Sequence, residues 1–402
     1  MLTPATGCDM ISIEQVESLA HVDASEWDQL AGGSVVASYG WLRTVEETRR
    51  SAVSSRYILG RTSAGLAGAV ACTIEEDARN SSVNGLLFGR LAKAAQRLHL
   101  GAVPCLLCGA GVGAGEPVLV RAGATAQERQ QVTATLVRAM EETAREKGWT
   151  ICFRQVRRVM SPLVEVLTNR GYLRGSELPT ACLELDPDWR SFADFRRHLK
   201  KTHPRTATNI NGELNRAKRA GLVIEQLNQP APYRERLHRL LDGHYARLNG
   251  EPFPFRADFF EQLKARLGDR AVIYVARIGA GLVGVQVQLR GGGEVVLPMI
   301  GIDHDSGRAA AAYFNLGYNR PIEDSIAAGQ RRIYFGKLAY DGKAHRGCSA
   351  VETDCYLRVW SGFQEQVLRA VWPLRSWRIS GKSAALHRDG QERDDGAASR
   401  ET

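Results

Sequence analysis

Apolar positions recur along this chain in two patterns, as short continuous runs and as longer stretches at helical spacing. Residues 57–75 contain an apolar run, a turn-forming segment at 63–65 and a second apolar run, which predicts a β-hairpin. Residues 271–290 have the same pattern and predict a second hairpin. Residues 125–147 carry apolar side chains at helical spacing and end before Gly148, a residue typical of a helix C-cap.

The remaining segments complete an alternation of strands and helices. Further strands are predicted at 118–120, 149–156, 181–185, 223–227, 294–302 and 333–335. Further helices are predicted within 27–50 and at 86–98, 161–169, 192–220 with a break at Pro204, 232–247, 256–267 and 309–328. This alternation predicts an α/β fold with mixed sheets, in which strands and helices pack in layers.

Two parts of the sequence repeat one motif. Arg-x-x-Ala-Gly-Leu-x-Gly occurs at 61–68 and again at 277–284, each time between two predicted strands. Downstream of each copy, a helix, a glycine, an apolar strand and an Arg-Gly pair follow in the same order, with the pairs at 170–171 and 346–347. Ala-Gly-Leu-x-Gly alone is a good hairpin sequence, because glycine adopts turn conformations easily. Two ordered matches therefore favour an internal duplication.

The duplication predicts two related domains in tandem, which suits a chain of 402 residues. The Asp-Pro-Asp segment at 186–188 marks the expected boundary, so the first domain spans 1–186 and the second spans 187–380. Residues 381–402 are polar and charged, with few large apolar side chains, and we expect this tail to be disordered.

Composition adds limits on partners and compartment. The formal net charge of +9 favours an anionic partner such as nucleic acid or a CoA-like nucleotide, although mild basicity also occurs without one. No run approaches the roughly 20 apolar residues of a membrane helix, and the N-terminus lacks a signal-peptide pattern, so we expect a cytoplasmic protein without membrane contact. The eight cysteines include one Cys-x-x-Cys at 105–108 without the second ligand pair of a zinc site, so no metal is expected.

The order of hairpin, third strand, central helix, strand and Arg-Gly element resembles the GNAT acyltransferase fold, and its tandem form resembles the FemAB-like branch, which includes a peptidoglycan biosynthesis and recognition group. The match is densest at 313–351, where an aromatic-rich helix start, a Pro-Ile-Glu helix, a Gly-x-x-Arg strand and a Lys-x-x-Arg-Gly element follow one another. The segment 198–221 resembles the basic helix of those proteins.

This resemblance implies an enzyme that forms an amide bond from an activated acyl donor. It implies that Lys343 contacts a phosphate or carbonyl of the donor, and that Glu323 acts as a base or as a first-turn helix acid. The GNAT pyrophosphate loop, Gln/Arg-x-x-Gly-x-Gly/Ala, is not evident in either half. Its absence favours an aminoacyl-tRNA donor over an acyl-CoA donor.

Candidate chemistry concentrates in the second half. Amide formation requires loss of a proton from the amine, stabilisation of an oxyanion and protonation of the leaving group. Residues 299–318 run from a strand end into a helix start, where backbone N–H groups can face an anion, although Asp-Ser-Gly there is also a common turn sequence. The candidate catalytic residues are Asp303, His304, Tyr318 and Lys343. The candidate donor- or substrate-binding residues are Tyr313, Asn315, Glu323, Lys337, His345 and Arg346.

A dense group of cations lies between 196 and 219, opposed by Glu213. This density suits contacts with the phosphates of RNA, and the alternative is a solvated helix face. The expected RNA-binding residues are Arg196, Arg197, Lys200, Lys201, Arg205, Arg216, Lys218 and Arg219.

We therefore expect a transferase that moves an aminoacyl group from tRNA to an amine of a small molecule or peptide, such as a cell-wall precursor or a natural product. No cofactor is expected besides the donor, because the ester of aminoacyl-tRNA is already activated. The alternatives are an acyl-CoA-dependent N-acyltransferase and a non-catalytic nucleic-acid-binding protein on the same scaffold. We expect the second half to hold most of the chemistry and the first half to bind the acceptor.

Overall fold

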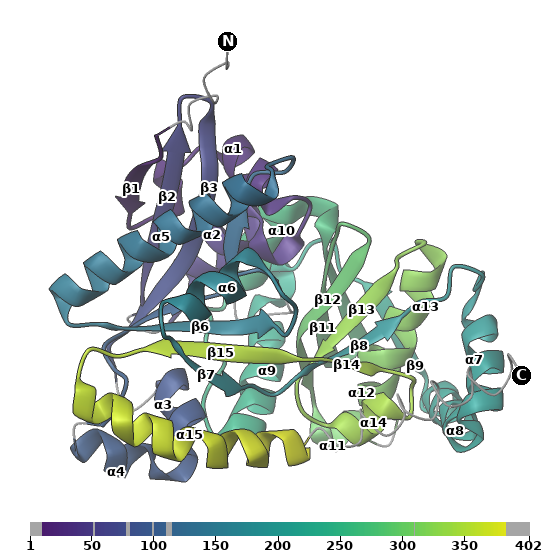
Figure 1. The fold of residues 1–402 in the computed structure, drawn as a ribbon. Helices are drawn as coiled ribbons and strands as arrows, with labels where there is room; N and C mark the ends of the chain where they lie inside the picture. Colours follow the sequence, from purple (N-terminus) through teal and green to yellow (C-terminus); the bar gives the residue numbers. More distant parts are fainter. Residues whose placement is uncertain are drawn as a thin grey trace, which may run out of the picture.

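The computed structural model describes residues 10–50, 53–77, 81–98, 100–109, 115–308 and 310–382. Two mixed sheets lie side by side, each with helices packed against it (Figure 1). The expected α/β fold with two related units is confirmed. The disorder expected for residues 381–402 falls almost wholly outside the described part of the chain, in which residues 381 and 382 end the last helix.

The first sheet has the strand order β1-β2-β3-β4-β6-β15-β7, with β5 paired to β3. Its strands are β1 (Ser12–Val16), β2 (Ser54–Thr62), β3 (Gly65–Glu75), β4 (Cys105–Cys108), β5 (Val118–Val120), β6 (Thr150–Arg157), β7 (Leu173–Ser176) and β15 (Thr353–Arg358). The helices of this half are α1 (Ala24–Ala31), α2 (Tyr39–Thr48), α3 (Ser82–Phe88), α4 (Ala92–Arg97), α5 (Ala126–Lys147), α6 (Pro162–Asn169) and α15 (Gly362–Lys382).

The second sheet has the strand order β14-β8-β13-β12-β11-β10-β9. Its strands are β8 (Thr180–Glu184), β9 (Leu222–Gln226), β10 (Ala271–Ile278), β11 (Gly281–Gly291), β12 (Glu294–Ile302), β13 (Arg332–Gly336) and β14 (Ser349–Val351). Its helices are α7 (Phe192–Thr202), α8 (Pro204–Arg219), α9 (Arg234–Asn249), α10 (Phe259–Leu267), α11 (His304–Gly307), α12 (Ala312–Phe314), the π-helical turn η7 (Asn315–Asn319), α13 (Arg320–Ala327) and α14 (Tyr340–Ala344).

The duplicated hairpins adopt the same register. Gly60 pairs with Gly68 in the first hairpin and Ala276 pairs with Gly284 in the second, and both ladders shift register at the next residue, which is the motif arginine. The last glycine of each motif is required by close packing. A Cβ atom on Gly68 would lie 2.5 Å from a methyl carbon of Val132, and one on Gly284 would lie 2.9 Å from a methyl carbon of Ile302.

The motif arginines also form equivalent ion pairs. Arg61 lies 2.8 Å from Glu14 of β1, and Arg277 lies 2.5 Å from Glu225 of β9. Each arginine thus links its hairpin to an edge strand of the same sheet. Repetition of register, tight glycine and ion pair in both halves confirms the duplication that the sequence indicates.

Each sheet contains one strand from the other half of the chain. Strand β8 precedes the boundary expected at residue 186, yet it pairs between β13 and β14 of the second sheet. Strand β15 comes near the end of the chain, yet it pairs between β6 and β7 of the first sheet. The sheets therefore do not divide the chain at residue 186, although the domain limits themselves stay a prediction. This exchange joins the two halves through their backbones.

A shared apolar core also joins the halves. The largest cluster of buried side chains contains Trp27, Trp41 and Tyr57 of the first half together with Phe253 and Phe259 of the second. The rings of Trp41 and Phe259 meet edge to face, with their centroids 6.4 Å apart. Burial of so many large side chains makes the join between the sheets a stable scaffold for a site.

The helix expected at 309–328 is interrupted. It consists of α12, the π-helical turn η7 and α13, instead of one continuous α-helix. Pro321 has no N–H group to donate to residue 317, so the α-helical hydrogen-bond ladder cannot pass through this point unchanged. None of the helices in the described ranges is long and apolar enough to cross a membrane.

Candidate functional site

Two cavities lie along the join between the sheets. The first has a volume of about 460 Å³ and the second of about 340 Å³, and Val296 of β12 lines both. The first is lined by residues around β5 and α6 together with Gly291, Glu294, Val296 and Tyr334 of the second half. The second is lined by Trp41, Val45, Arg49, Gln155, Thr180, Tyr245, Phe255, Val296, Leu297, Pro298, Met299, Gly336 and Lys337. Residues of both halves therefore form each cavity.

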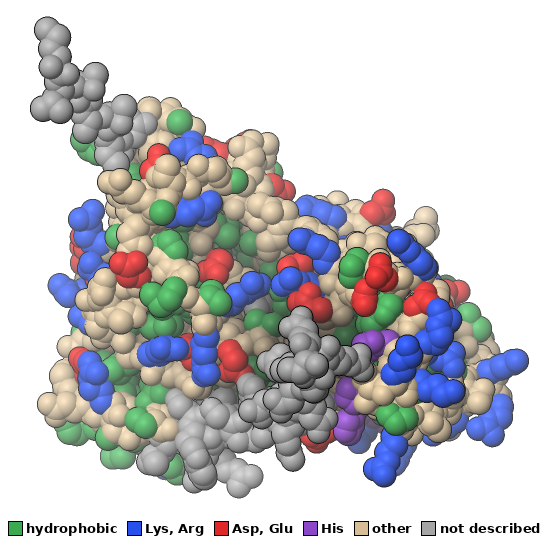
Figure 2. All heavy atoms as spheres, turned by 45° about the vertical axis from the view of Figure 1, so that its right-hand side comes forward, with side chains coloured by type: hydrophobic (Ala, Val, Ile, Leu, Met, Phe, Trp, Pro, Cys, Tyr) green, Lys and Arg blue, Asp and Glu red, His purple; other side chains and the backbone are tan. Residues whose placement is uncertain are grey.

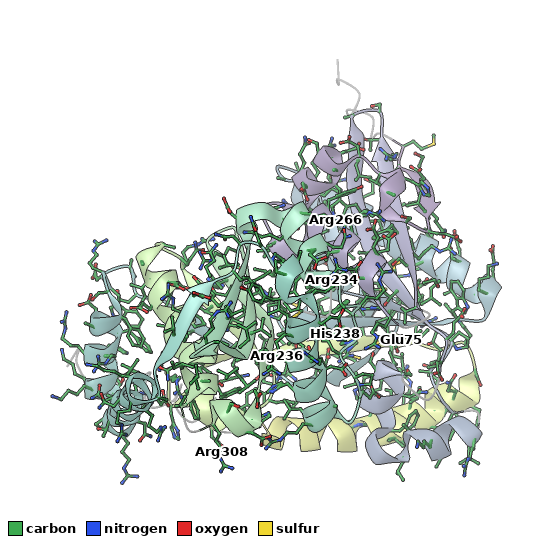
Figure 3. The ribbon with its side chains drawn as sticks, turned by 180° about the vertical axis from the view of Figure 1, so that it is seen from behind. Glu75, Arg234, Arg236, His238, Arg266 and Arg308 are labelled. Atoms are coloured by element: carbon green, nitrogen blue, oxygen red, sulfur yellow. The ribbon has the colours of Figure 1, made fainter. Side chains whose placement is uncertain are left out.

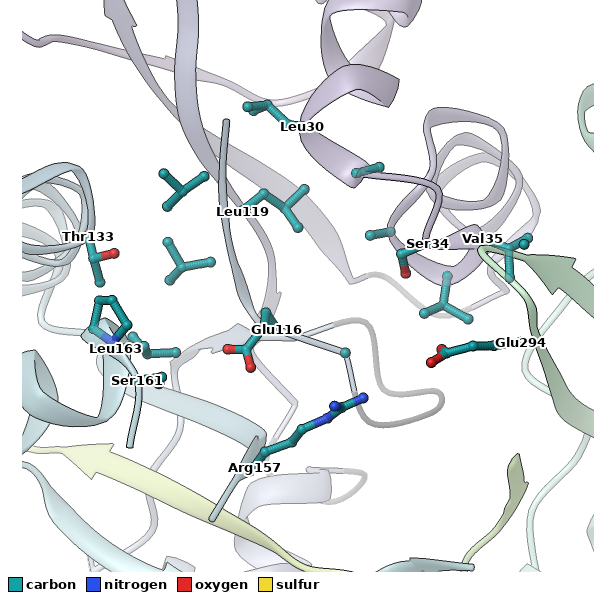
Figure 4. Close-up of a pocket in the computed structure, with 18 of the residues that line it drawn as sticks. Leu30, Ser34, Val35, Glu116, Leu119, Thr133, Arg157, Ser161, Leu163 and Glu294 are labelled. Atoms are coloured by element: carbon teal, nitrogen blue, oxygen red, sulfur yellow. The ribbon is translucent and has the colours of Figure 1, made fainter. Parts of the chain in front are cut away.

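The first cavity contains charged groups of both signs (Figure 4). Arg157 at the end of β6 donates a hydrogen bond of 3.1 Å to the Tyr334 hydroxyl, which connects the two halves. Glu116 is exposed and lines this cavity. Desolvation raises its pKa above the ordinary value, although the nearby Arg157 acts against this shift. Glu294 lies on the opposite wall. This arrangement suits a ligand with both hydrogen-bond donors and acceptors.

The helix that begins beside the first cavity already has its N-terminus capped. The Thr125 hydroxyl accepts from the Glu128 amide at 3.2 Å, and the Glu128 carboxylate accepts from the Thr125 amide at 2.7 Å. A carboxylate thus occupies the place where the N-terminus of α5 would attract a phosphate. This capping agrees with the lack of a pyrophosphate loop in the sequence.

The second cavity lies where the second sheet opens. Strand β12 pairs with β13 as far as Val296 and then separates from it. At the same place the register with β11 shifts, because Leu289 pairs with Val296 and Val287 pairs with Met299. Leu297 and Pro298 are therefore a bulge whose backbone forms part of the cavity wall. A bulge of this kind leaves backbone polar groups out of the ladder.

A buried cluster of charged side chains adjoins the wall of the second cavity at Lys337. Glu177 accepts hydrogen bonds of 2.9 Å from both Arg154 and Lys337. Burial alone would raise the pKa of Glu177, but the two cations lower it to about 2. Burial lowers the pKa of Lys337, although Glu177 acts against that shift. Lys337, a predicted substrate-binding residue, thus lines the second cavity while its ammonium group is held by Glu177.

Lys343 lies under the loop beside the second cavity. Its side chain is 4% exposed, and its ammonium group donates to the carbonyls of Gly336 and Lys337, each at 3.1 Å. Burial lowers its pKa to about 8. The next residues, Leu338 and Ala339, have positive φ angles of 68° and 49°. Lys343 therefore orders a strained loop at the end of β13, a place from which it does not line either cavity.

Asp303 and His304 lie beyond the end of β12 and line neither of these two cavities. Asp303 caps α11, and Arg236 of α9 (Figure 3) donates to it at 2.8 Å, a bond that lowers the pKa of this carboxyl. The His304 ring stacks on His244, with centroids 5.5 Å apart and planes within 3° of parallel. Desolvation lowers the pKa of both imidazoles, that of His244 to about 4.

Three other predicted residues meet in the core of the second half. Arg346 lies 2.6 Å from Glu213, and its guanidinium lies 4.6 Å from the centre of the Tyr318 ring. Asn315 donates to the Glu213 carbonyl at 3.1 Å. These groups are buried and paired, so they hold α8 against η7. Tyr313 is half-buried and its ring centre lies 5.8 Å from that of Tyr318.

Glu323 and His345 point to solvent on other parts of the surface. Most of the predicted RNA-binding residues are also exposed, and they share the face formed by α7 and α8. Figure 2 shows Lys and Arg side chains gathered at this end of the molecule. The exposed members are Arg197, Lys200, Lys201, Arg205, Arg216, Lys218 and Arg219. Arg196 is half-buried and donates to Asn211.

Sequence reasoning missed the residues of the first half that line the cavities. Trp41, Val45 and Arg49 recur at four-residue intervals, a signal for one helix face that the sequence contained. Glu116 and Arg157 had no motif to indicate them. Among the described residues, no group of three or more His, Cys, Asp or Glu side chains could hold a metal ion.

Residues 18–371 match the model of the FemAB-like family, which is described by peptidoglycan biosynthesis and recognition. No curated protein sequence matches this chain. A crystal structure of FemX is 10% identical with a TM-score of 0.55, and the match covers 89% of this chain and 99% of that one.

The C-terminal domain (DUF2156) of a protein from Agrobacterium fabrum, described as a lysylphosphatidylglycerol synthetase, is 12% identical with a TM-score of 0.52. That match covers 88% of this chain and 96% of the other. A tandem GNAT protein from the clavulanic acid biosynthesis pathway is 13% identical with a TM-score of 0.46, over 86% of this chain and 98% of the other.

Proposed function

Because this chain belongs to the FemAB-like family of acyltransferases, we propose that it transfers an aminoacyl group from an aminoacyl-tRNA to an amine held between its two sheets. The observation that carries this proposal is the opening of the second sheet at the Leu297–Pro298 bulge, on the wall of a cavity formed by both halves. The family supports the acyl transfer, and the capped N-terminus of α5 and the basic face support the choice of donor.

The bulge offers a place for the reacting carbonyl. The amide N–H of Leu297 would donate to the oxygen of the ester carbonyl as negative charge develops there. Pro298 has no N–H group, so it adds no competing donor at this point. Enclosure in the cavity would favour the neutral form of the attacking amine, because burial disfavours an ammonium ion.

The bond changes balance without a cofactor. The amine nitrogen forms a bond to the carbonyl carbon, and the bond from that carbon to the ribose oxygen of tRNA breaks. The proton leaves the nitrogen and ends on the ribose oxygen.

The donor is proposed from two features. The N-terminus of α5 is capped by its own glutamate, which disfavours a CoA pyrophosphate at that position. Seven exposed cations on α7 and α8 provide a surface for the phosphates of tRNA.

A transfer assay tests this proposal. The purified protein would be incubated with bulk tRNA charged with labelled amino acids and with a soluble peptidoglycan precursor or a panel of small amines as acceptors. We expect labelled amide product that disappears after ribonuclease treatment of the donor. Product formed from an acyl-CoA and insensitive to ribonuclease would instead identify an acyl-CoA-dependent enzyme. Binding of RNA without transfer from any donor would favour a non-catalytic protein.

A further inference from the structure

Two residues that line the second cavity have side-chain donors without an acceptor among the described residues. Trp41, Val45 and Arg49 line it from one side of α2 and the residue that follows this helix. The Trp41 side chain is 1% exposed, and its indole N–H has no hydrogen-bond partner among the described residues. A buried donor without an acceptor costs free energy, so its presence beside a cavity points to a ligand that supplies acceptors.

Arg49 is the stronger donor. In the described part of the chain, no hydrogen bond or ion pair to its guanidinium is found, and Glu75 and Tyr57 influence it only through longer-range charge. The Glu75 carboxylate is engaged by the hydroxyls of Ser81 and Ser82, at 3.0 and 2.6 Å. Burial lowers the pKa of Arg49. Arg49 is half-buried, so its guanidinium is partly desolvated without a counter-ion, and a bound anion would offset this cost.

The other charged residues that line the cavity do not provide a counter-charge for Arg49. No Asp or Glu is among the described residues that line it. Lys337 is the second cation of the lining, and its ammonium group pairs at 2.9 Å with Glu177, a carboxylate that also pairs with Arg154. A single cation, Arg49, therefore faces the cavity without a counter-charge.

The shape and the remaining walls favour a carboxylate. The volume of about 340 Å³ is at the lower end for ligand sites and suits an amino acid or a short peptide more than a nucleotide. Tyr245 and Phe255 offer apolar surface for a carbon skeleton. The planar fork of an arginine matches the two oxygens of a carboxylate.

We infer that the second cavity binds a substrate carboxylate through Arg49, so that a free carboxylate on the amino-acid-like part of the substrate is a requirement for productive binding. The assignment to the acyl-transfer site rests on the proposed function. Two parts of the reaction could supply this group: the acceptor, or an acidic side chain on the transferred aminoacyl group. Both present the same chemistry to Arg49.

Binding of small probes tests the inference without any transfer. The probes are L-alanine, D-alanine, L-glutamate and D-alanyl-D-alanine, each with its carboxamide counterpart, and inorganic phosphate. Calorimetry and tryptophan fluorescence would follow binding to the wild type, to R49M and R49K, and to R50M. Arg50 is the matched control, because it is the next residue, is exposed and pairs with Asp242 at 3.5 Å.

We expect at least one acid to bind the wild type about 10- to 100-fold more tightly than its amide. R49M would lose this preference, R49K would retain part of it, and R50M would behave as the wild type. Thermal unfolding would show that R49M is folded, since only the backbone of Arg49 pairs with Phe255. Equal binding of acid and amide, undiminished binding to R49M, no binding of any acid, or tighter binding of phosphate than of every acid would each overturn the inference.

A transfer assay with the same variants distinguishes a carboxylate on the acceptor from one on the aminoacyl group. It also distinguishes failure of the proposed function from failure of the carboxylate site. A preference for acceptors with a free carboxylate that R49M abolishes would place the group on the acceptor. A preference for tRNA charged with Asp or Glu that R49M abolishes would place it on the donor. Carboxylate binding without transfer from any aminoacyl-tRNA would contradict the proposed function and leave the site intact. Transfer in which R49M keeps the full preference would contradict this site alone.

Discussion

Arg346 and Glu213 form an ion pair inside the second half, with 2.6 Å between their charged groups and each side chain only 5% exposed. Arg346 belongs to the Arg-Gly element that the duplication repeats, and the sequence suggested it as a donor-binding residue. Its guanidinium is instead enclosed between Glu213 and the ring of Tyr318. The pair thus joins α8 to the segment that follows α14.

We predict that R346A lowers the free energy of unfolding by about 3–5 kcal/mol, because it leaves the Glu213 carboxylate buried without a counter-charge. Urea unfolding monitored by circular dichroism would measure the change. R216A is the control, since Arg216 is exposed on the same helix as Glu213, and it should change stability by less than about 0.5 kcal/mol. Native stability of R346A combined with lost donor binding would show that Arg346 serves the ligand.

Burial of Lys343 makes the free energy of unfolding depend on pH in the alkaline range. Its pKa is lowered from 10.5 to about 8 by burial, so between these values the unfolded chain holds a proton that the folded chain has released. Stability therefore rises with pH across this window, by about 3 kcal/mol relative to a variant without the group. Urea unfolding of the wild type and K343M between pH 7.5 and 10.5 would measure the difference. Parallel pH profiles for the two proteins would refute this account.

The stacked imidazoles of His244 and His304 predict a slope of the same sign in the acidic range, where stability again rises with pH. Burial lowers the pKa of His244 from 6.5 to about 4, and Arg247 and His304 add to this shift. Between these values the unfolded chain binds a proton that the folded chain does not, so stability falls as the pH falls from 6.5 to 4. The loss should be about 3 kcal/mol larger in the wild type than in H244F, which keeps an aromatic ring at this place. Equal acid sensitivity of both proteins in urea titrations would show that His244 does not cause this loss of stability.

The local structure of this chain follows from local patterns. The hairpins at β2–β3 and β10–β11 were predictable because the motif at 61–68 and 277–284 specifies turn geometry and tight packing with few residues. Helix α5 was predictable from its period and from Gly148, which adopts a left-handed conformation with φ of 69°. These signals need no knowledge of distant contacts.

The exchange of β8 and β15 and both cavities could not be predicted in this way. The apolar run of β15 is compatible with either sheet, and only pairing with β6, about 200 residues away, decides its place. The cavities depend on how two sheets meet, so Trp41 and Tyr334 come together through packing that no short motif encodes. The catalytic role of Asp303 stays a prediction, because the residue caps α11 and turn caps use the same residue types as active-site carboxylates.

The basic face of α7 and α8 remains the feature by which the nucleic-acid partner can be tested. We predict that replacing Lys200, Lys201, Arg205 and Lys218 by alanine weakens tRNA binding at least tenfold and makes it less dependent on salt. Each lost phosphate contact reduces the slope of log K against log salt concentration by somewhat less than 1. Filter binding of uncharged tRNA across a salt series would measure both quantities. Arg121, Arg138, Arg145 and Lys147, exposed on or just before α5 of the other half, provide a control set that removes the same number of charges. Their replacement should leave affinity and slope unchanged. If both sets of replacements weaken binding alike, tRNA would be responding to the net charge of +9 and not to this face.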